Sequence, residues 1–204
     1  MRSLLLLLLA VALASLTGCA HHDGLAVGEA LTIGDGRLAP AVSVEVAEGT
    51  GSSSDRRTLF TEARARALVG PTRQQLAGLV GVSQLEWVGP RAPIWGALNL
   101  GPGLERFSST VFFEAIAQAR LGTGFVLAEL VEPYSPLNPW GAEAAPWPML
   151  QNAELSTPRS TIRSRVLVTL ALVGDIDVRF TRDPLYVTSL MLGIARIQEL
   201  RGAR

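Results

Sequence analysis

The first eighteen residues form an export leader, and the leader fixes the compartment in which the rest of the chain must fold. Arg2 is the only charged side chain ahead of an uninterrupted apolar run over residues 4–14. A positive residue followed by such a run is typical of a secretory signal peptide. The run is too short for a membrane-spanning helix, which needs about 20 apolar residues. We therefore expect residues 1–18 to be a signal peptide that is removed after export.

The segment Leu16-Thr17-Gly18-Cys19 follows the apolar run and resembles the lipobox of bacterial membrane lipoproteins. The resemblance covers the first nineteen residues. It implies that the Cys19 sulfur carries a diacylglyceryl group, that the chain is cut before Cys19, and that the new amine is acylated. Cys19 is the only cysteine of the chain, so it has no disulfide partner. Ala20 follows it, and in lipoproteins of the enteric type this implies the outer membrane, with the chain lipid-anchored and facing the periplasm.

The charge balance of the remaining chain gives no support to nucleic-acid binding. All basic residues are arginines, and once the leader is removed 17 of them stand against 18 acids. Nucleic-acid-binding domains carry a basic excess instead. Residues 74–84 resemble a helix-turn-helix motif through Ala77, Gly81 and Ser83. Export and the scarcity of basic residues in this segment argue against DNA binding.

Missing residue types exclude most catalytic chemistry. The chain has no lysine for a Schiff base or a phosphate loop, and its only histidines are His21 and His22. His21, His22 and Asp23 would form a weak metal site in a flexible segment, so we predict no metal and no cofactor. Asp175 and Asp177 are two residues apart, but we interpret them as solvated acids near a turn. The sequence therefore predicts no catalytic residues and no enzyme.

The order of the expected elements indicates an α+β fold, with a mostly antiparallel sheet and helices packed on one face in two layers. Alternation predicts a strand over residues 41–47, and we expect further strands over 124–131, 165–173 and 176–181. The last two would form a hairpin around Gly174 and Asp175. Helices are expected over 55–69, 73–80 and 104–121, and after Pro184. Too few alternating segments are apparent for a membrane barrel of even eight strands.

These expectations divide the chain into three parts. Residues 1–18 are the signal peptide, residues 19–40 are the lipidated Cys19 with a tether, and residues 41–204 form a single periplasmic α+β domain. A proline-rich segment over residues 133–148 contains Tyr134, Trp140 and Trp147, which we predict to bind an envelope protein partner. The predicted function is an accessory subunit in envelope assembly, secretion or transport. The alternative is a carboxylate-dependent periplasmic hydrolase or glycan-acting enzyme.

Overall fold

The described part of the chain consists of eight β-strands. The structure is a computed structural model, and it describes residues 20–34, 37–54, 56–71, 73–133, 161–179 and 183–201. The strands, in chain order, are β1 (Ala20–Gly34), β2 (Arg37–Ser53), β3 (Arg57–Val69), β4 (Arg73–Trp87), β5 (Pro93–Phe107), β6 (Thr110–Pro133), β7 (Thr161–Arg179) and β8 (Leu185–Arg201). The described residues contain no helix that is long and apolar enough to span a membrane.

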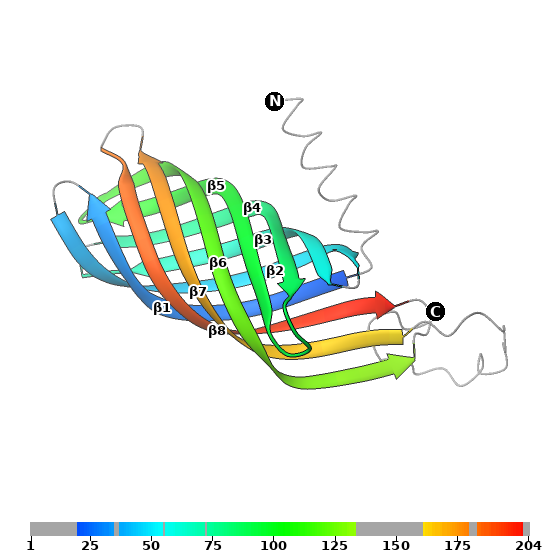
Figure 1. The fold of residues 1–204 in the computed structure, drawn as a ribbon. Coiled ribbons are helices and arrows are strands. Elements are labelled where there is room, and N and C mark those ends of the chain that lie inside the picture. Colours follow the sequence, from blue (N-terminus) through cyan, green and yellow to red (C-terminus); the bar gives the residue numbers. More distant parts are fainter. Residues whose placement is uncertain are drawn as a thin grey trace, which may run out of the picture.

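The eight strands form one closed antiparallel barrel (Figure 1). Each strand pairs with the next along the chain, and β8 returns to pair with β1, with Ala20 opposite Glu199 and Ile33 opposite Tyr186. We call the end at which β1 begins and β8 ends the terminal end, and the other end the distal end. The four connections at the distal end span two to five residues. At the terminal end, residues 134–160 connect β6 to β7.

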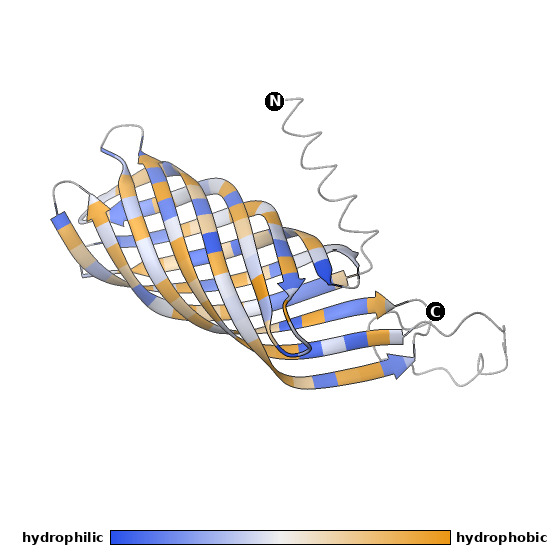
Figure 2. Ribbon diagram, in the orientation of Figure 1, coloured by the Kyte–Doolittle hydropathy of each residue, from blue (hydrophilic) through white to orange (hydrophobic). Residues whose placement is uncertain are grey.

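Strict alternation of side chains explains why these residues form strands. In β3, Glu62, Arg64 and Arg66 are buried, whereas Ala63 and Ala65 between them are exposed. Successive side chains of a strand point to opposite faces, so one set lies inside the barrel and the other on its outer surface. Figure 2 shows the resulting alternation of polar and apolar positions along the strands. The outward-facing set is almost entirely apolar, whereas the inward-facing set mixes charged and polar side chains with apolar ones. An apolar outer face around buried charges is the reverse of a water-soluble protein.

Strand β6 is the longest and projects beyond the barrel rim at the terminal end. Its pairing with β5 ends at Thr123, whereas its pairing with β7 continues to Pro133. The register shifts between Val126 and Ala128, which marks a β-bulge. Figure 1 shows the ends of β6, β7 and β8 extending together at this end as a curved flap, and β8 remains paired with β1 as far as Glu199. We call residues 127–133, 161–165 and 196–201 the terminal flap.

The predicted α+β fold and its two layers are wrong, because the segments expected to be helices are strands. Residues 55–69 and 73–80 lie largely in β3 and β4, the segment 104–121 in β5 and β6, and the segment after Pro184 in β8. Small residues at every second position, such as Ala63, Ala65 and Ala67, fit a helix as well as a strand. In addition, most of the expected tether, residues 19–40, lies in β1 and the start of β2.

Several strand predictions are confirmed in position but not in detail. Residues 41–47 lie in β2, residues 124–131 in β6, and residues 165–173 in β7. The predicted hairpin around Gly174 and Asp175 is wrong, because β7 runs without a break from Thr161 to Arg179. A tight turn of two residues instead connects β5, which ends at Phe107, to β6, which begins at Thr110. There Ser108 has a φ of 57°, in the left-handed region that favours glycine.

Candidate functional site

A network of charged side chains lies in the distal half of the barrel interior, beside buried apolar clusters such as that of Leu68, Leu185 and Val187. Near the distal rim, Arg73 of β4 forms an ion pair with Glu105 of β5, and Arg179 Nη1 of β7 lies 3.5 Å from Glu105 Oε2. All three side chains are buried. Arg73 and Glu105 lie on neighbouring strands, whereas Arg179 reaches Glu105 past the intervening strand β6.

Arg66 forms the next layer toward the middle of the barrel. Its guanidinium pairs with Asp175, and Nη2 lies 3.6 Å from Asp177 Oδ2. Arg66 Nη2 also donates to Gln75 Oε1 at 2.6 Å. The amide nitrogen of Gln75 in turn donates to Asp177 Oδ2 at 2.6 Å and to Glu114. Arg66 and Gln75 together therefore bind three buried acids from strands β6 and β7.

Glu45 of β2 is the centre of a third layer. Its carboxylate accepts Arg120 Nη1 at 2.5 Å and Gln118 Nε2 at 3.0 Å, both from β6 on the far side of the barrel. Arg64 Nη1 lies 3.5 Å from Glu45 Oε2. Arg64 also donates two hydrogen bonds, of 2.7 and 3.0 Å, to Glu62. A buried charge is tolerated only when it is paired in this way.

An apolar layer follows toward the terminal end. It consists of side chains from six strands, namely Ala20, Phe60, Leu85, Trp87, Val126, Leu167 and Ile197, with Trp95 packed against them. Trp95 lies directly over Gly122 of the neighbouring strand, where a Cβ atom would approach the indole ring to 2.6 Å. A side chain at position 122 would therefore displace this ring.

A cavity of about 80 Å³ lies where the charged and apolar layers meet. Its lining combines Phe60 and Trp95 with Glu45, Arg64 and Arg120. A polar space of this size has room for a few water molecules, each of which needs about 10–15 Å³. The cavity suits water that completes the hydrogen bonding of the network.

A further cluster of polar side chains lies inside the barrel near the terminal end. Glu199 of β8 accepts hydrogen bonds of 3.0 Å from both Ser53 and Thr58, and Arg165 Nη1 lies 3.5 Å from its second oxygen. The Arg165 guanidinium lies 3.9 Å from the ring centroid of Trp87, a cation–π contact. Arg165 also donates to Glu129 at 2.9 Å, a contact within the terminal flap. Through Glu199 and Arg165, the flap contacts Ser53, Thr58 and Trp87 of the other strands.

The interior as a whole is close to neutral and occupied by its own side chains. The buried charged residues of the described chain are seven acids and six arginines, with His22 in addition. Such a lining provides no excess charge to attract one kind of ion. The layers described above lie at successive depths, so side chains occupy the interior along the barrel.

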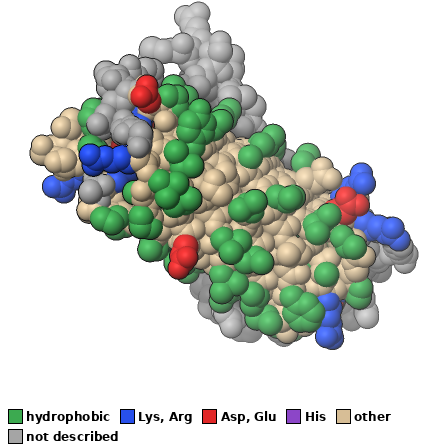
Figure 3. Space-filling model, turned by 60° about the vertical axis from the view of Figure 1, so that its left-hand side comes forward, with side chains coloured by type: hydrophobic (Ala, Val, Ile, Leu, Met, Phe, Trp, Pro, Cys, Tyr) green, Lys and Arg blue, Asp and Glu red, His purple; other side chains and the backbone are tan. Residues whose placement is uncertain are grey.

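The outer surface is an apolar belt around the barrel. Outward-facing side chains such as Leu98 and Leu100 of β5 and Leu192 and Ile194 of β8 are 59 to 65% exposed. Figure 3 shows hydrophobic side chains spread over the visible face of the barrel wall, with most charged side chains near its two ends. From Ile94 to Leu104, at about 3.3 Å per residue and a tilt of about 40°, the belt is about 25 Å tall. We refer to this surface as the outer belt.

The described residues do not include the main predicted site residues. Cys19, Tyr134, Trp140 and Trp147 lie outside them, so their predicted roles stay predictions. His22 and its neighbours His21 and Asp23 are described, and the three do not converge, although His21 Nε2 lies 3.9 Å from Asp23 Oδ2. His22 faces the interior, where Nε2 lies 3.3 Å from Glu62 Oε2, whereas Asp23 binds Arg196 on the outer surface. Within the described chain, no group of three or more His, Cys, Asp or Glu side chains could hold a metal ion.

The interpretation of Asp175 and Asp177 as solvated turn residues is wrong. Both are buried inside the barrel, 3% and 0% exposed, and both face Arg66. The signal that could have identified the interior network is the alternation of charged with apolar residues, as in Asp175-Ile-Asp-Val-Arg179 and Glu62-Ala-Arg-Ala-Arg66. Residues 74–84, which resemble a helix-turn-helix, lie entirely within strand β4.

Among the comparisons with known proteins, the one with solved structures bears on the fold. No family model matches this sequence, and no curated protein matches it either. Among solved structures, the chain is similar to the crystal structure of Ail, the attachment invasion locus protein of Yersinia pestis, with a TM-score of 0.51 at 10% identity. The match covers 89% of this chain and 99% of Ail. Neisserial surface protein A matches with a TM-score of 0.47 at 9% identity, over 87% of this chain and 96% of that protein.

The closed barrel and its likeness to Ail overturn the predicted function. An accessory subunit built on an α+β domain requires helices packed on an open sheet, and the described chain has neither. The alternative of a carboxylate-dependent periplasmic hydrolase or glycan-acting enzyme is also wrong. The acids that it would have used, such as Asp175 and Glu45, are held by arginines inside the barrel. The likeness to Ail at 10% identity is therefore one of fold alone.

Proposed function

We propose that this chain is an integral β-barrel of the bacterial outer membrane that serves as a closed membrane anchor and not as a pore. The observation that carries the proposal is the outer belt. Its height of about 25 Å matches the apolar band of outer-membrane barrels. In water, so much contiguous exposed apolar surface would cause aggregation. In a bilayer, the same surface is solvated by lipid chains.

The closed interior supports an anchoring role over a conducting one. Arg66, Glu45 and Glu105 each pair with side chains from other strands, and the apolar layer around Phe60 and Trp95 follows. An ion crossing the barrel would have to break several buried ion pairs in succession, each at a cost of several kcal/mol. We assign no reaction to the chain.

A lipid on Cys19 fits this barrel, because Ala20, the next residue, is the first residue of β1 at the terminal end. Acyl chains at that position would enter the leaflet next to the terminal end. We propose that this leaflet is the periplasmic one, so that the terminal end faces the periplasm. Pro133 and Thr161, which flank residues 134–160, are also at this end. Any partner contact made by Tyr134, Trp140 or Trp147 would then be made on the periplasmic side.

The proposal is tested by fractionation and by conductance. The full chain should remain in the outer-membrane pellet after an alkaline carbonate wash. It should also migrate faster on a denaturing gel when unheated than when boiled, as folded barrels do. Purified chain reconstituted into a planar bilayer should give no stepwise conductance. Release by carbonate would contradict the membrane location, whereas regular conductance steps would contradict the closed interior.

A further inference from the structure

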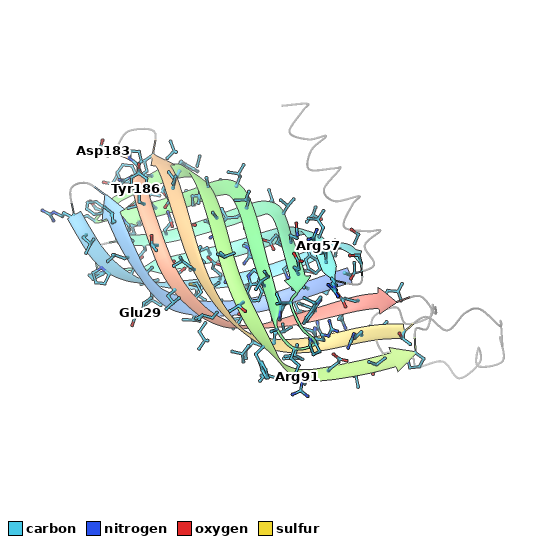
Figure 4. The ribbon with its side chains drawn as sticks, viewed as in Figure 1. Glu29, Arg57, Arg91, Asp183 and Tyr186 are labelled. Carbon is cyan, nitrogen blue, oxygen red and sulfur yellow. The ribbon has the colours of Figure 1, made fainter. Side chains whose placement is uncertain are left out.

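Glu29 is a charged side chain on the otherwise apolar outer surface of this barrel. It lies on β1 equally far from Leu25 and Ile33, which are outward-facing and 53% and 47% exposed. Within the described strands, it is the one charged side chain facing outward between the two ends of the outer belt. Figure 4 shows it pointing away from the barrel wall, between Arg57 and Arg91 near the terminal end and Asp183 and Tyr186 at the distal end.

The residues around Glu29 are partly polar and small. On β8 its direct neighbour is Leu190, and the diagonal neighbour is Thr188, whose side chain also faces outward. Such diagonal side chains lie about 7–8 Å apart. Thr188 in turn pairs with Gly174 of β7, an exposed outward position without a side chain. A carboxyl group, a hydroxyl group and a glycine thus form one patch on the otherwise apolar wall of β7, β8 and β1.

Lipid chains offer no hydrogen-bond partner to a carboxyl group at this depth. An ionisable side chain in the middle of a bilayer is costly unless another polar group pairs with it. The ends of the outer belt are too far along β1 for the Glu29 side chain to reach water, since Leu25 and Ile33 are each about 13 Å away. Small and hydroxyl-bearing residues are also typical of protein contacts within membranes.

We propose that this patch packs against the same patch of a second copy of the chain, so that Glu29 of each copy hydrogen-bonds Thr188 or Glu29 of the other. The inference rests on the proposed membrane location. Two copies inserted in the same direction and related by a two-fold axis along the membrane normal present identical groups at identical depths. The patch is self-complementary in this arrangement, because each copy supplies both a carboxyl group and a hydroxyl group. Gly174 lets the two walls approach closely.

Photocrosslinking in native membranes tests the proposal. Leu190→benzoylphenylalanine places a photoreactive side chain beside Glu29, and Leu98→benzoylphenylalanine on β5, across the barrel, is the matched control. Each is expressed together with a second copy that carries a different tag. We expect an adduct of two chains with both tags from position 190 and none from position 98. Glu29→Leu should lower the yield at position 190 about tenfold, whereas Glu29→Gln, which can still donate and accept, should retain it.

Each other outcome overturns a defined part of the reasoning. Equal adducts from positions 190 and 98 would mean random collision, and an adduct of position 190 with a different protein would mean a different partner. Either result, or no adduct from a chain that stays in carbonate-washed membranes, overturns the dimer and leaves the membrane barrel intact. An unchanged yield with Glu29→Leu overturns the role of Glu29. A chain absent from the membrane pellet overturns the proposed function itself.

Discussion

Replacing Arg66 is the most direct test of the buried charged network inside the barrel. Its side chain is 1% exposed and lies against Asp175 and Asp177, with Gln75 as a further acceptor. Arg66→Met removes the cation and leaves two buried acids without it. Removing one partner of a buried ion pair typically costs about 3–5 kcal/mol. With a urea dependence of about 2 kcal/mol per M, the unfolding midpoint should fall by about 2 M.

The assay is urea unfolding of the full chain reconstituted in lipid vesicles, followed by tryptophan fluorescence and by the mobility of unheated samples on gels. Arg106→Met is the matched control, because Arg106 is exposed and, within the described residues, its side chain donates to the Ser108 carbonyl at 3.3 Å and not to a buried acid. We expect that control to change the free energy of unfolding by less than about 0.5 kcal/mol. Replacing Asp175 and Asp177 with Asn in the Arg66→Met chain should restore much of the loss. Equal effects of Arg66→Met and Arg106→Met would refute the buried network.

Three further predictions concern single positions. Ser108→Gly should stabilise the barrel by about 0.5–1 kcal/mol, because φ is 57° there, and a lower urea midpoint would show that the turn is not strained. Gly122→Val should displace the Trp95 ring and destabilise the barrel by about 1–3 kcal/mol, with a red shift in tryptophan emission; an unchanged spectrum would contradict the packing of Trp95 on Gly122. Mass spectrometry of the mature chain should find lipid on residue 19, and Cys19→Ala should give an uncleaved precursor or a non-acylated product; an unmodified mature N-terminus elsewhere would contradict the lipobox.

The strands could be located from the sequence in part, and β2 shows how far. The alternation of Val42, Val44 and Val46 with Ser43 and Glu45 predicts a strand, and the structure has one. Alternation does not say which face meets water. In a soluble domain the valines would face the core, whereas here Ser43 and Glu45 face the interior and Val42 and Val46 lie outside. The predicted strand is therefore confirmed, but the face that a soluble domain would bury is the exposed one here.

In β3, the predicted helix failed for a different reason. Glu62 and Arg66, four residues apart, fit a pair along a helix, and Gly70 with Pro71 fits a helix end. The same residues fit a strand, because positions two and four apart also share one face. In the structure Glu62 binds Arg64, two residues on, and Arg66 binds acids of β7. Contacts between β3 and β7, more than 100 residues apart, could not be obtained from local pattern.

The pairing of β1 with β8 has a consequence for the order in which the barrel can be made. Ala20 lies opposite Glu199, so the first strand cannot be fully hydrogen-bonded until the last has been synthesised and delivered. Until then, β1 presents fifteen residues of open backbone on one side, a surface to which other extended chains can add. Contacts between residues so distant in sequence form slowly. The unfinished chain is therefore prone to aggregation, and a truncation that removes β8 should yield an aggregating product and not a smaller barrel.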